Sequence, residues 1–142
     1  MRKMITLFFI VCLILSGCSE DGKADWKTSP TFTKDKMTLH GLEGKFGIIK
    51  VNGESDEPEF PAGGQGRLYQ LYFLEKDFNG KNYKMTATHK DTGETVKLYE
   101  WAIENKQSGA KFGLDKEGLW KISVVVDEKP YIDFVIEAEK KE

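Results

Sequence analysis

The stretch Leu119-Trp-Lys-Ile-Ser-Val-Val-Val126, the turn Asp127-Glu-Lys-Pro130 and the stretch Tyr131-Ile-Asp-Phe-Val-Ile-Glu137 decide the fold. In the first stretch the large apolar residues Trp120, Ile122, Val124 and Val126 alternate with others, and Ile132, Phe134 and Ile136 do so in the second. Successive side chains of a strand point to opposite faces, so each stretch presents one apolar face. The sequence therefore predicts a β-hairpin that covers a core on one side.

Five stretches before this hairpin also predict strands, namely residues 46–51, 68–74, 83–90, 95–103 and 110–114. Residues 68–74 are apolar on both faces, which predicts a central strand. A change of face near Glu100 predicts a β-bulge. Residues 52–66 and 104–109 are predicted loops, and residues 138–142 are a predicted frayed, charged end. About seven strands spaced by turns predict an all-β, antiparallel β-sandwich without an amphipathic helix.

The first 17 residues have the features of an export signal. Arg2 and Lys3 give a positive start, an apolar run follows, and the small residues Ser16 and Gly17 end it. The run is shorter than the roughly 20 residues that span a bilayer as a helix. This composition predicts that residues 1–17 are removed after export.

The four residues Leu15-Ser16-Gly17-Cys18 resemble the lipobox of bacterial lipoproteins. The resemblance implies that the chain is cut before Cys18 and that the Cys18 sulfur carries a diacylglycerol. Two acyl chains make a stable anchor, because each buried CH₂ contributes about 0.8 kcal/mol. The implied location is the cell membrane, lipid-anchored on the extracytoplasmic side. The alternative is an uncleaved anchor helix with a chance cysteine at its end.

The predicted organisation is a signal peptide (1–17), a lipidated cysteine and tether (18–31), and a β-sandwich domain (32–142). Trp26, within the polar tether, is expected to pack on the domain, with a place at the membrane interface as the alternative. The net charge is −2 before the signal leaves, so a nucleic-acid partner is not expected. The two cysteines are Cys12, in the signal, and Cys18. Cysteine-based zinc sites and nucleophiles are therefore excluded from the mature domain.

Residues 26–137 resemble a family of uncharacterised Bacillus-type, Gram-positive lipoproteins with an immunoglobulin-like domain. Four stretches carry the resemblance: Trp26-Lys-Thr-Ser-Pro-Thr-Phe32, Gly44-Lys-Phe-Gly-Ile48, Ala87-Thr-His-Lys-Asp-Thr-Gly-Glu94 and Gly118-Leu-Trp-Lys-Ile122. The family pattern has a Trp-His-x-Trp cluster where this chain reads Tyr69-Gln-Leu-Tyr-Phe73. A ligand bound through that cluster is therefore not carried over to this chain.

Gly118-x-Trp120 also resembles the aromatic corner of immunoglobulin-like folds, in which a tyrosine hydroxyl bonds to the backbone upstream. Because the residue here is a tryptophan, the resemblance implies an indole N–H as the donor.

Two histidines and two methionines raise the alternative of a copper-type metal accessory protein. His40 lies three residues after Met37, and His89 lies four residues after Met85. A thioether together with an imidazole is a ligand set for Cu(I). Met85 and His89 are four residues apart on a strand, about 13 Å along its axis. They cannot share one ion, so a site would need distant residues to converge.

Other motifs favour structural interpretations. Asp91-Thr92-Gly93 spells the aspartic-protease triplet, but it lies in a predicted exposed turn, where Asp and Gly are common. The acidic residues Glu54, Asp56, Glu57 and Glu59 fit a solvated loop and lack the spacing of a calcium loop.

The aromatic residues exceed what one buried face can use, so Tyr69, Tyr72 and Trp101 are candidates for an exposed binding patch. The sequence thus favours a lipid-anchored binding module of the cell envelope. Neither catalysis nor a cofactor is expected, and the partner is an unknown envelope protein or glycan.

Overall fold

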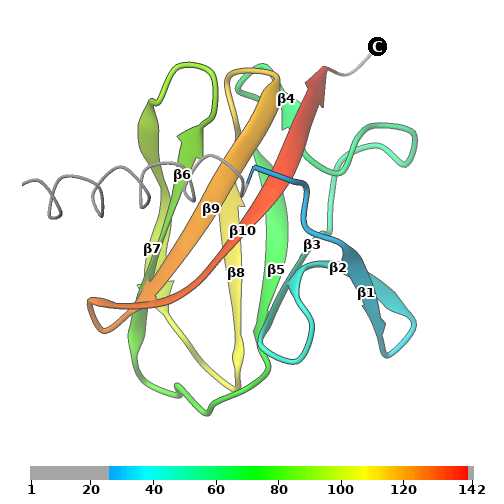
Figure 1. Cartoon of the computed structure of the whole chain (residues 1–142). Coiled ribbons are helices and arrows are strands. Elements are labelled where there is room, and N and C mark those ends of the chain that lie inside the picture. Colours follow the sequence, from blue (N-terminus) through cyan, green and yellow to red (C-terminus); the bar gives the residue numbers. More distant parts are fainter. Residues whose placement is uncertain (1–25, 141–142) are drawn as a thin grey trace, which may run out of the picture.

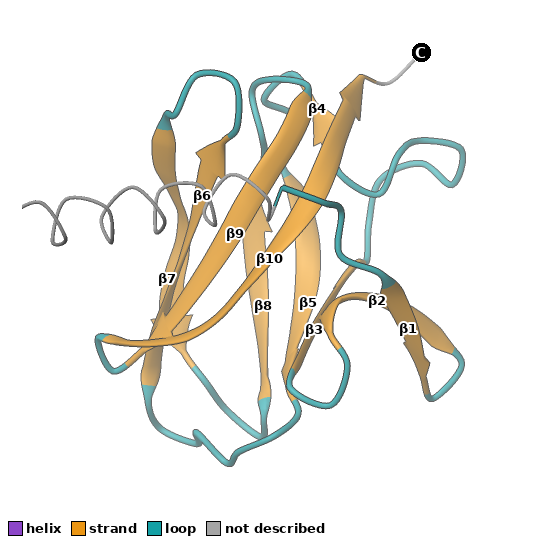
Figure 2. Cartoon of the chain, viewed as in Figure 1, coloured by secondary structure: helices purple, strands orange, loops and turns teal. Residues whose placement is uncertain are grey.

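The computed structural model describes residues 26–140, and the predicted signal and lipobox lie outside them. Two five-stranded sheets pack face to face (Figure 1, Figure 2). The first has the order β1 (Thr31–Lys34), β2 (Met37–Leu42), β3 (Phe46–Lys50), β5 (Arg67–Phe73) and β8 (Gln107–Phe112). The second has the order β4 (Pro61–Ala62), β10 (Lys129–Lys140), β9 (Gly118–Val126), β6 (Asn82–His89) and β7 (Thr95–Ala102). The predicted all-β sandwich is confirmed.

The core lies between the two sheets and follows the predicted alternation of β9 and β10. Trp120 is fully buried, and Phe134 of β10 packs against Phe46 of β3 with ring centroids 5.7 Å apart. Tyr83 of β6 and Ser108 of β8 join the sheets through a hydrogen bond of 2.9 Å between their hydroxyls. Burial raises the pKa of Tyr83 to about 12, so this hydroxyl stays protonated at neutral pH.

The β9–β10 hairpin turns through two residues rather than the predicted four. Asp127 and Glu128 have φ angles of 50° and 67°, and Lys129 already pairs with Val126. Two consecutive positive φ angles match the right-handed twist of the flanking strands. The register then shifts at Tyr131, whose hydroxyl donates to the Lys45 carbonyl oxygen over 2.7 Å. The bulge thus places Tyr131 against the turn between β2 and β3.

The predicted bulge near Glu100 is present two residues earlier, at Leu98. Met85 pairs with Tyr99 and Thr86 pairs with Lys97, which leaves Leu98 as the extra residue. Because the bulge turns Leu98 inward, its side chain is buried in the core.

Several predicted loop segments are strands, and their pairing explains why. Residues 107–109 belong to β8, where Ser108 and Gly109 pair with β5. Residues 138–140, predicted to fray, continue β10, because Glu139 pairs with Pro61 of β4. The β4–β10 pairing is parallel, so the sandwich is not purely antiparallel. The strands β1, β2 and β4 have no distinct pattern of their own, so the sequence does not predict them.

The second half of the predicted tether docks on the second sheet. The Lys121 ammonium lies over the Trp26 ring, with its nitrogen 5.0 Å from the ring centroid. This cation–π contact confirms that Trp26 packs on the domain. Ser29 exchanges two hydrogen bonds with Val135 of β10, and β1 begins at Thr31. Within the predicted tether, residues 18–31, Ser29 therefore bonds to β10 and Thr31 pairs with β2.

Candidate functional site

The aromatic corner forms as the Gly118-x-Trp120 motif implied. The Trp120 indole N–H donates to the Lys116 carbonyl oxygen over 3.0 Å. His89 lies beside it, with ring centroids 4.7 Å apart, and its Nε2 donates to the Glu117 carbonyl oxygen over 2.8 Å. Two ring donors thus bind two consecutive carbonyls of the turn before β9. Gly118 completes the corner, because its φ of 116° disfavours any side chain.

The corner removes His89 from the predicted metal ligands. A carbonyl only accepts, so Nε2 carries the proton, and Nδ1 accepts from Thr92, whose hydroxyl lies 3.0 Å away. Both ring nitrogens are therefore occupied. The same contact gives the Asp91-Thr92-Gly93 turn a structural role, since Thr92 holds the His89 ring.

The remaining metal candidates lie apart. Met85 is fully buried in the core of the second sheet, whereas His40 and Met37 lie on β2 of the first. The Met37 sulfur accepts from the Tyr72 hydroxyl at 3.7 Å. Within residues 26–140, no group of three His, Cys, Asp or Glu side chains is placed to hold a metal ion. The candidates that the sequence suggested therefore do not converge on one site.

His40 is half-buried, with its ring edge-on to Phe60 at a centroid distance of 5.0 Å. Burial lowers its pKa, and the nearby Glu59 carboxylate opposes that shift. When the pH falls below the ordinary histidine pKa of 6.5, His40 is therefore protonated more readily in the unfolded chain than in the folded chain.

We expect the free energy of unfolding to fall as the pH drops from 7.5 to 5.5, and His40→Gln to reduce that slope. Urea denaturation at several pH values measures it. An unchanged slope in His40→Gln would contradict this prediction.

The acidic loop carries a buried ion-pair cluster rather than only solvated carboxylates. The Glu57 side chain is fully shielded and accepts from Arg67 Nε at 2.7 Å and Nη2 at 2.8 Å. The Lys50 ammonium donates to the same carboxylate at 2.7 Å. These bonds hold the pKa of Glu57 well below its usual range. The Glu57 carboxylate is thus paired with the Lys50 and Arg67 cations, which gives Glu57 a structural role.

The three candidate aromatic residues do not form one patch. Tyr69 is buried, stacks on Phe112 with centroids 4.3 Å apart, and donates to the Glu59 carbonyl oxygen. The prediction for Tyr69 is therefore wrong, because its strand is covered on that face. Tyr72 lies half-buried on β5 of the first sheet, whereas Trp101 lies on β7 of the second and is 64 % exposed. Trp101 alone remains a candidate contact residue.

A groove of about 660 Å³ lies on the second sheet. Its walls include Asn82, Lys84 and Thr86 of β6, Glu100 of β7, and Ser123 and Val125 of β9. Lys84 is paired with both Glu100 and Val125 across neighbouring strands, so three strands contribute to the floor. The sequence offered no signal for this groove, because it forms only where β9 pairs with the β6–β7 hairpin, which lies well before it along the chain.

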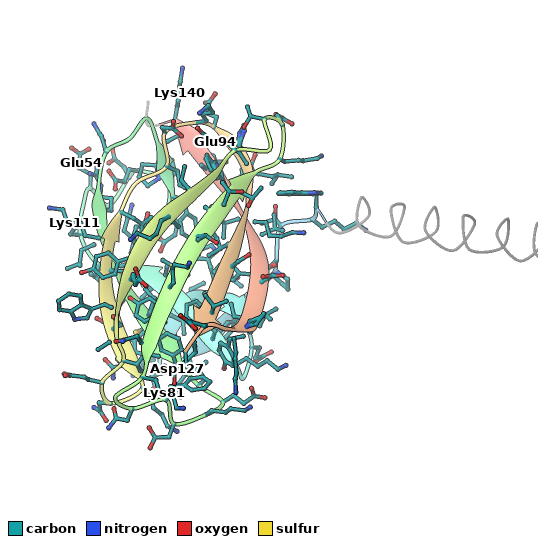
Figure 3. All side chains as sticks on the ribbon, turned by 90° about the vertical axis from the view of Figure 1, so that its left-hand side faces the viewer. Glu54, Lys81, Glu94, Lys111, Asp127 and Lys140 are labelled. Atoms are coloured by element: carbon teal, nitrogen blue, oxygen red, sulfur yellow. The ribbon has the colours of Figure 1, made fainter. Side chains whose placement is uncertain are left out.

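Two ion pairs border the groove. Lys81 lies 3.3 Å from Asp127 at one end, where Figure 3 shows the two side chains together. Lys97 lies 3.3 Å from Glu100. Both pairs are half-exposed, so each contributes little to stability. The two lysines neutralise the charges of Asp127 and Glu100, which line the groove.

A second hollow of about 360 Å³ adjoins the first and is lined by Asn82, Glu100, Trp101 and Ala102. Asn82 and Glu100 line both hollows, so the two share a rim. Trp101 follows Glu100 on the edge strand β7 and is paired with the core-facing Tyr83, so its side chain leaves β7 on the face opposite to Glu100. It reaches the second hollow at the edge of the sheet.

The architecture is similar to that of a solved structure. It is the crystal structure of a protein from Bacillus anthracis assigned as a lipoprotein, which matches with a TM-score of 0.64. The sequences are 21 % identical, over 81 % of this chain and 87 % of that one. The likeness shows the fold. No family model and no curated protein matches the chain.

Among the residues that the structure describes, no helix is long and apolar enough to cross a membrane.

Proposed function

We propose that this protein is a lipid-anchored binding module of the cell envelope, held on the outer face of the cytoplasmic membrane and acting without catalysis. The observation that carries the proposal is Leu15-Ser16-Gly17-Cys18, placed between an apolar export signal and a folded domain. The assignment of the Bacillus anthracis structure as a lipoprotein supports it.

The docked tether supports a position close to the membrane. Eight residues lead from Cys18 to Trp26, which contacts the domain. A fully extended chain spans at most about 3.6 Å per residue, so this segment reaches about 29 Å. A module anchored through Cys18 would therefore act near the lipid surface.

The order of the strands supports an immunoglobulin-like domain. The strands β3, β5 and β8 are neighbours in one sheet, in the order of strands A, B and E of that fold. The strands β10, β9, β6 and β7 are neighbours in the other, in the order G, F, C and C′. Trp120 lies at the start of the strand that corresponds to F, where the aromatic corner of that fold occurs.

A binding role without catalysis fits the state of the side chains that could act as acids or bases. His89 has a hydrogen-bond partner at each ring nitrogen. The Glu57 carboxylate is held by Arg67 and Lys50. These groups stabilise turns and loops, and the exposed groove is left as the surface for a partner.

Replacing Cys18 by alanine tests the anchor. In a Gram-positive host fed with labelled fatty acid, we expect the unmodified protein to take up label and Cys18→Ala to take up none, because the thiol is the acceptor. Radiolabel on the immunoprecipitated protein is the measurement. It is preferred to membrane fractionation alone, because an uncleaved signal could also hold a protein at the membrane.

Cys12→Ala is the matched control, since Cys12 lies in the predicted signal and leaves with it. That variant should be labelled as strongly as the unmodified protein. Label on Cys18→Ala, or none on the unmodified protein, would remove the basis of the proposal.

A further inference from the structure

The groove on the second sheet has the size and openness of a site for a small or chain-like ligand. Its volume of about 660 Å³ lies within the range of roughly 300–1,000 Å³ that is usual for ligand pockets. It is lined by strands β6, β7 and β9, which are paired along their length. The floor is therefore preformed, so a ligand would not have to order it.

The polar groups of the groove suit a ligand rich in hydroxyls. Asn82 presents an amide, Thr86 and Ser123 present hydroxyls, and the Lys84 ammonium stands across the strands from the Glu100 carboxylate. Amides and hydroxyls both donate and accept, while the ammonium only donates and the carboxylate only accepts. Sugar hydroxyls also donate and accept, so each of these side chains has a possible partner on a saccharide.

The charge of the groove argues against a polyanion. The cation within it is Lys84, whereas Glu100, Asp127 and Glu128 are acidic. The ion pairs with Lys97 and Lys81 offset two of these acids. A phosphate-rich polymer would need a clearly basic surface. An uncharged ligand meets no such barrier.

Trp101 supplies an aromatic surface at the edge of the sheet, where its side chain leaves β7 on the face opposite to that of Glu100. It is 64 % exposed, the most exposed large hydrophobic side chain among residues 26–140. It lines the adjoining hollow with Asn82 and Glu100, which also line the groove. The C–H face of a sugar ring stacks on an indole, and adjacent polar groups then fix the orientation of the ring.

We propose that this groove, together with Trp101, binds an uncharged saccharide chain such as the glycan backbone of a wall polymer. The inference rests on the proposed envelope function, because it names the partner of that module. A chain of several sugar rings would pass over the edge strand β7, with one ring on Trp101 and the next rings against Asn82 and the Lys84 region.

The test is a calorimetric titration of the full-length mature protein in detergent with chitohexaose and cellohexaose, and with a glycerol phosphate polymer as the anionic arm. We expect at least one neutral hexasaccharide to bind with a dissociation constant of about 0.1–1 mM, as suits an open groove. Trp101→Ala and Asn82→Ala should each weaken it about tenfold.

Leu68→Ala is the matched control, because Leu68 is 40 % exposed on β5 of the other sheet. It should bind like the unmodified protein. Binding of neither hexasaccharide at millimolar concentrations, binding of the anionic polymer alone, or equal binding by Trp101→Ala would overturn the proposal. Fatty-acid labelling of Cys18 is measured separately, so a failure of saccharide binding leaves the anchor standing.

Discussion

Replacing Trp120 by alanine is expected to lower the free energy of unfolding by about 3–5 kcal/mol. Trp120 is among the largest fully buried side chains, and its removal would leave a cavity between the sheets. It would also deprive His89 of its ring neighbour and the Lys116 carbonyl of its donor. The loss is a large fraction of the 5–15 kcal/mol that typically stabilises a domain.

Guanidinium denaturation followed by far-ultraviolet circular dichroism measures this loss without relying on tryptophan fluorescence. Trp101→Ala is the matched control, because it deletes the same side chain at an exposed position and should change stability by less than about 0.5 kcal/mol. Trp120→Phe fills most of the volume but cannot donate, and should cost about 1–3 kcal/mol. Equal stability of Trp120→Ala and Trp101→Ala would show that the corner is not a structural anchor.

The second large effect is expected from Glu57→Gln, which keeps the shape of the side chain and removes its charge. The substitution would leave the Arg67 guanidinium and the Lys50 ammonium close together without their shared carboxylate. Removing one partner of a shielded ion pair is strongly destabilising, because the other charges stay desolvated. We expect a melting temperature lower by many degrees and faster proteolysis within residues 52–59.

The effect of Glu57→Gln should depend on pH in a defined direction. The folded pKa of Glu57 lies below its ordinary value of 4.5, first because of the Arg67 hydrogen bond and then because of Lys50. A depressed carboxyl pKa contributes stability that is fully present above the unfolded value and is lost as the pH falls through the folded value. The difference between the two proteins should therefore be constant above about pH 5.5 and shrink below about pH 4.5.

Thermal melts at pH 7 and at acidic pH provide the comparison, with limited proteolysis as a second measurement. Asp56→Asn is the control, since Asp56 is the exposed neighbour in the same loop and should melt like the unmodified protein. A Glu57→Gln protein that melts like Asp56→Asn would refute the role of the cluster.

The sequence predicted the parts of the fold that depend on local pattern. The alternation in β9 and β10 shows in the order of residues alone, because a strand has a period of two. The bulge in β7 was found within two residues for the same reason, since an extra residue reverses the alternation. The indole donor of Trp120 followed from one motif, because donor and acceptor are only four residues apart.

The candidate site was less accessible to sequence reasoning. Tyr69 and Trp101 are both aromatic residues of predicted strands, yet one is buried and the other exposed. Tyr69 lies on β5, which has β3 and β8 on either side, whereas Trp101 lies on β7 at the edge of its sheet. Likewise, the sequence does not distinguish Glu57 from the other acids of its loop. Only the structure shows that Arg67 and Lys50 bind its carboxylate.

By itself the sequence determined the strand-rich domain and the faces of the strands that turn inward. It also predicts the export signal with Cys18 after it, which lies outside the described residues. These features depend on residues that are close in the sequence, because the spacing of residues along a strand fixes the face to which each side chain points. The tertiary structure alone decided that His89 and Trp120 close one turn, that Glu57 is buried between two cations, and that β6, β7 and β9 form a groove beside Trp101. Those contacts join residues that are far apart along the chain, and only the pairing and packing of whole strands bring them together.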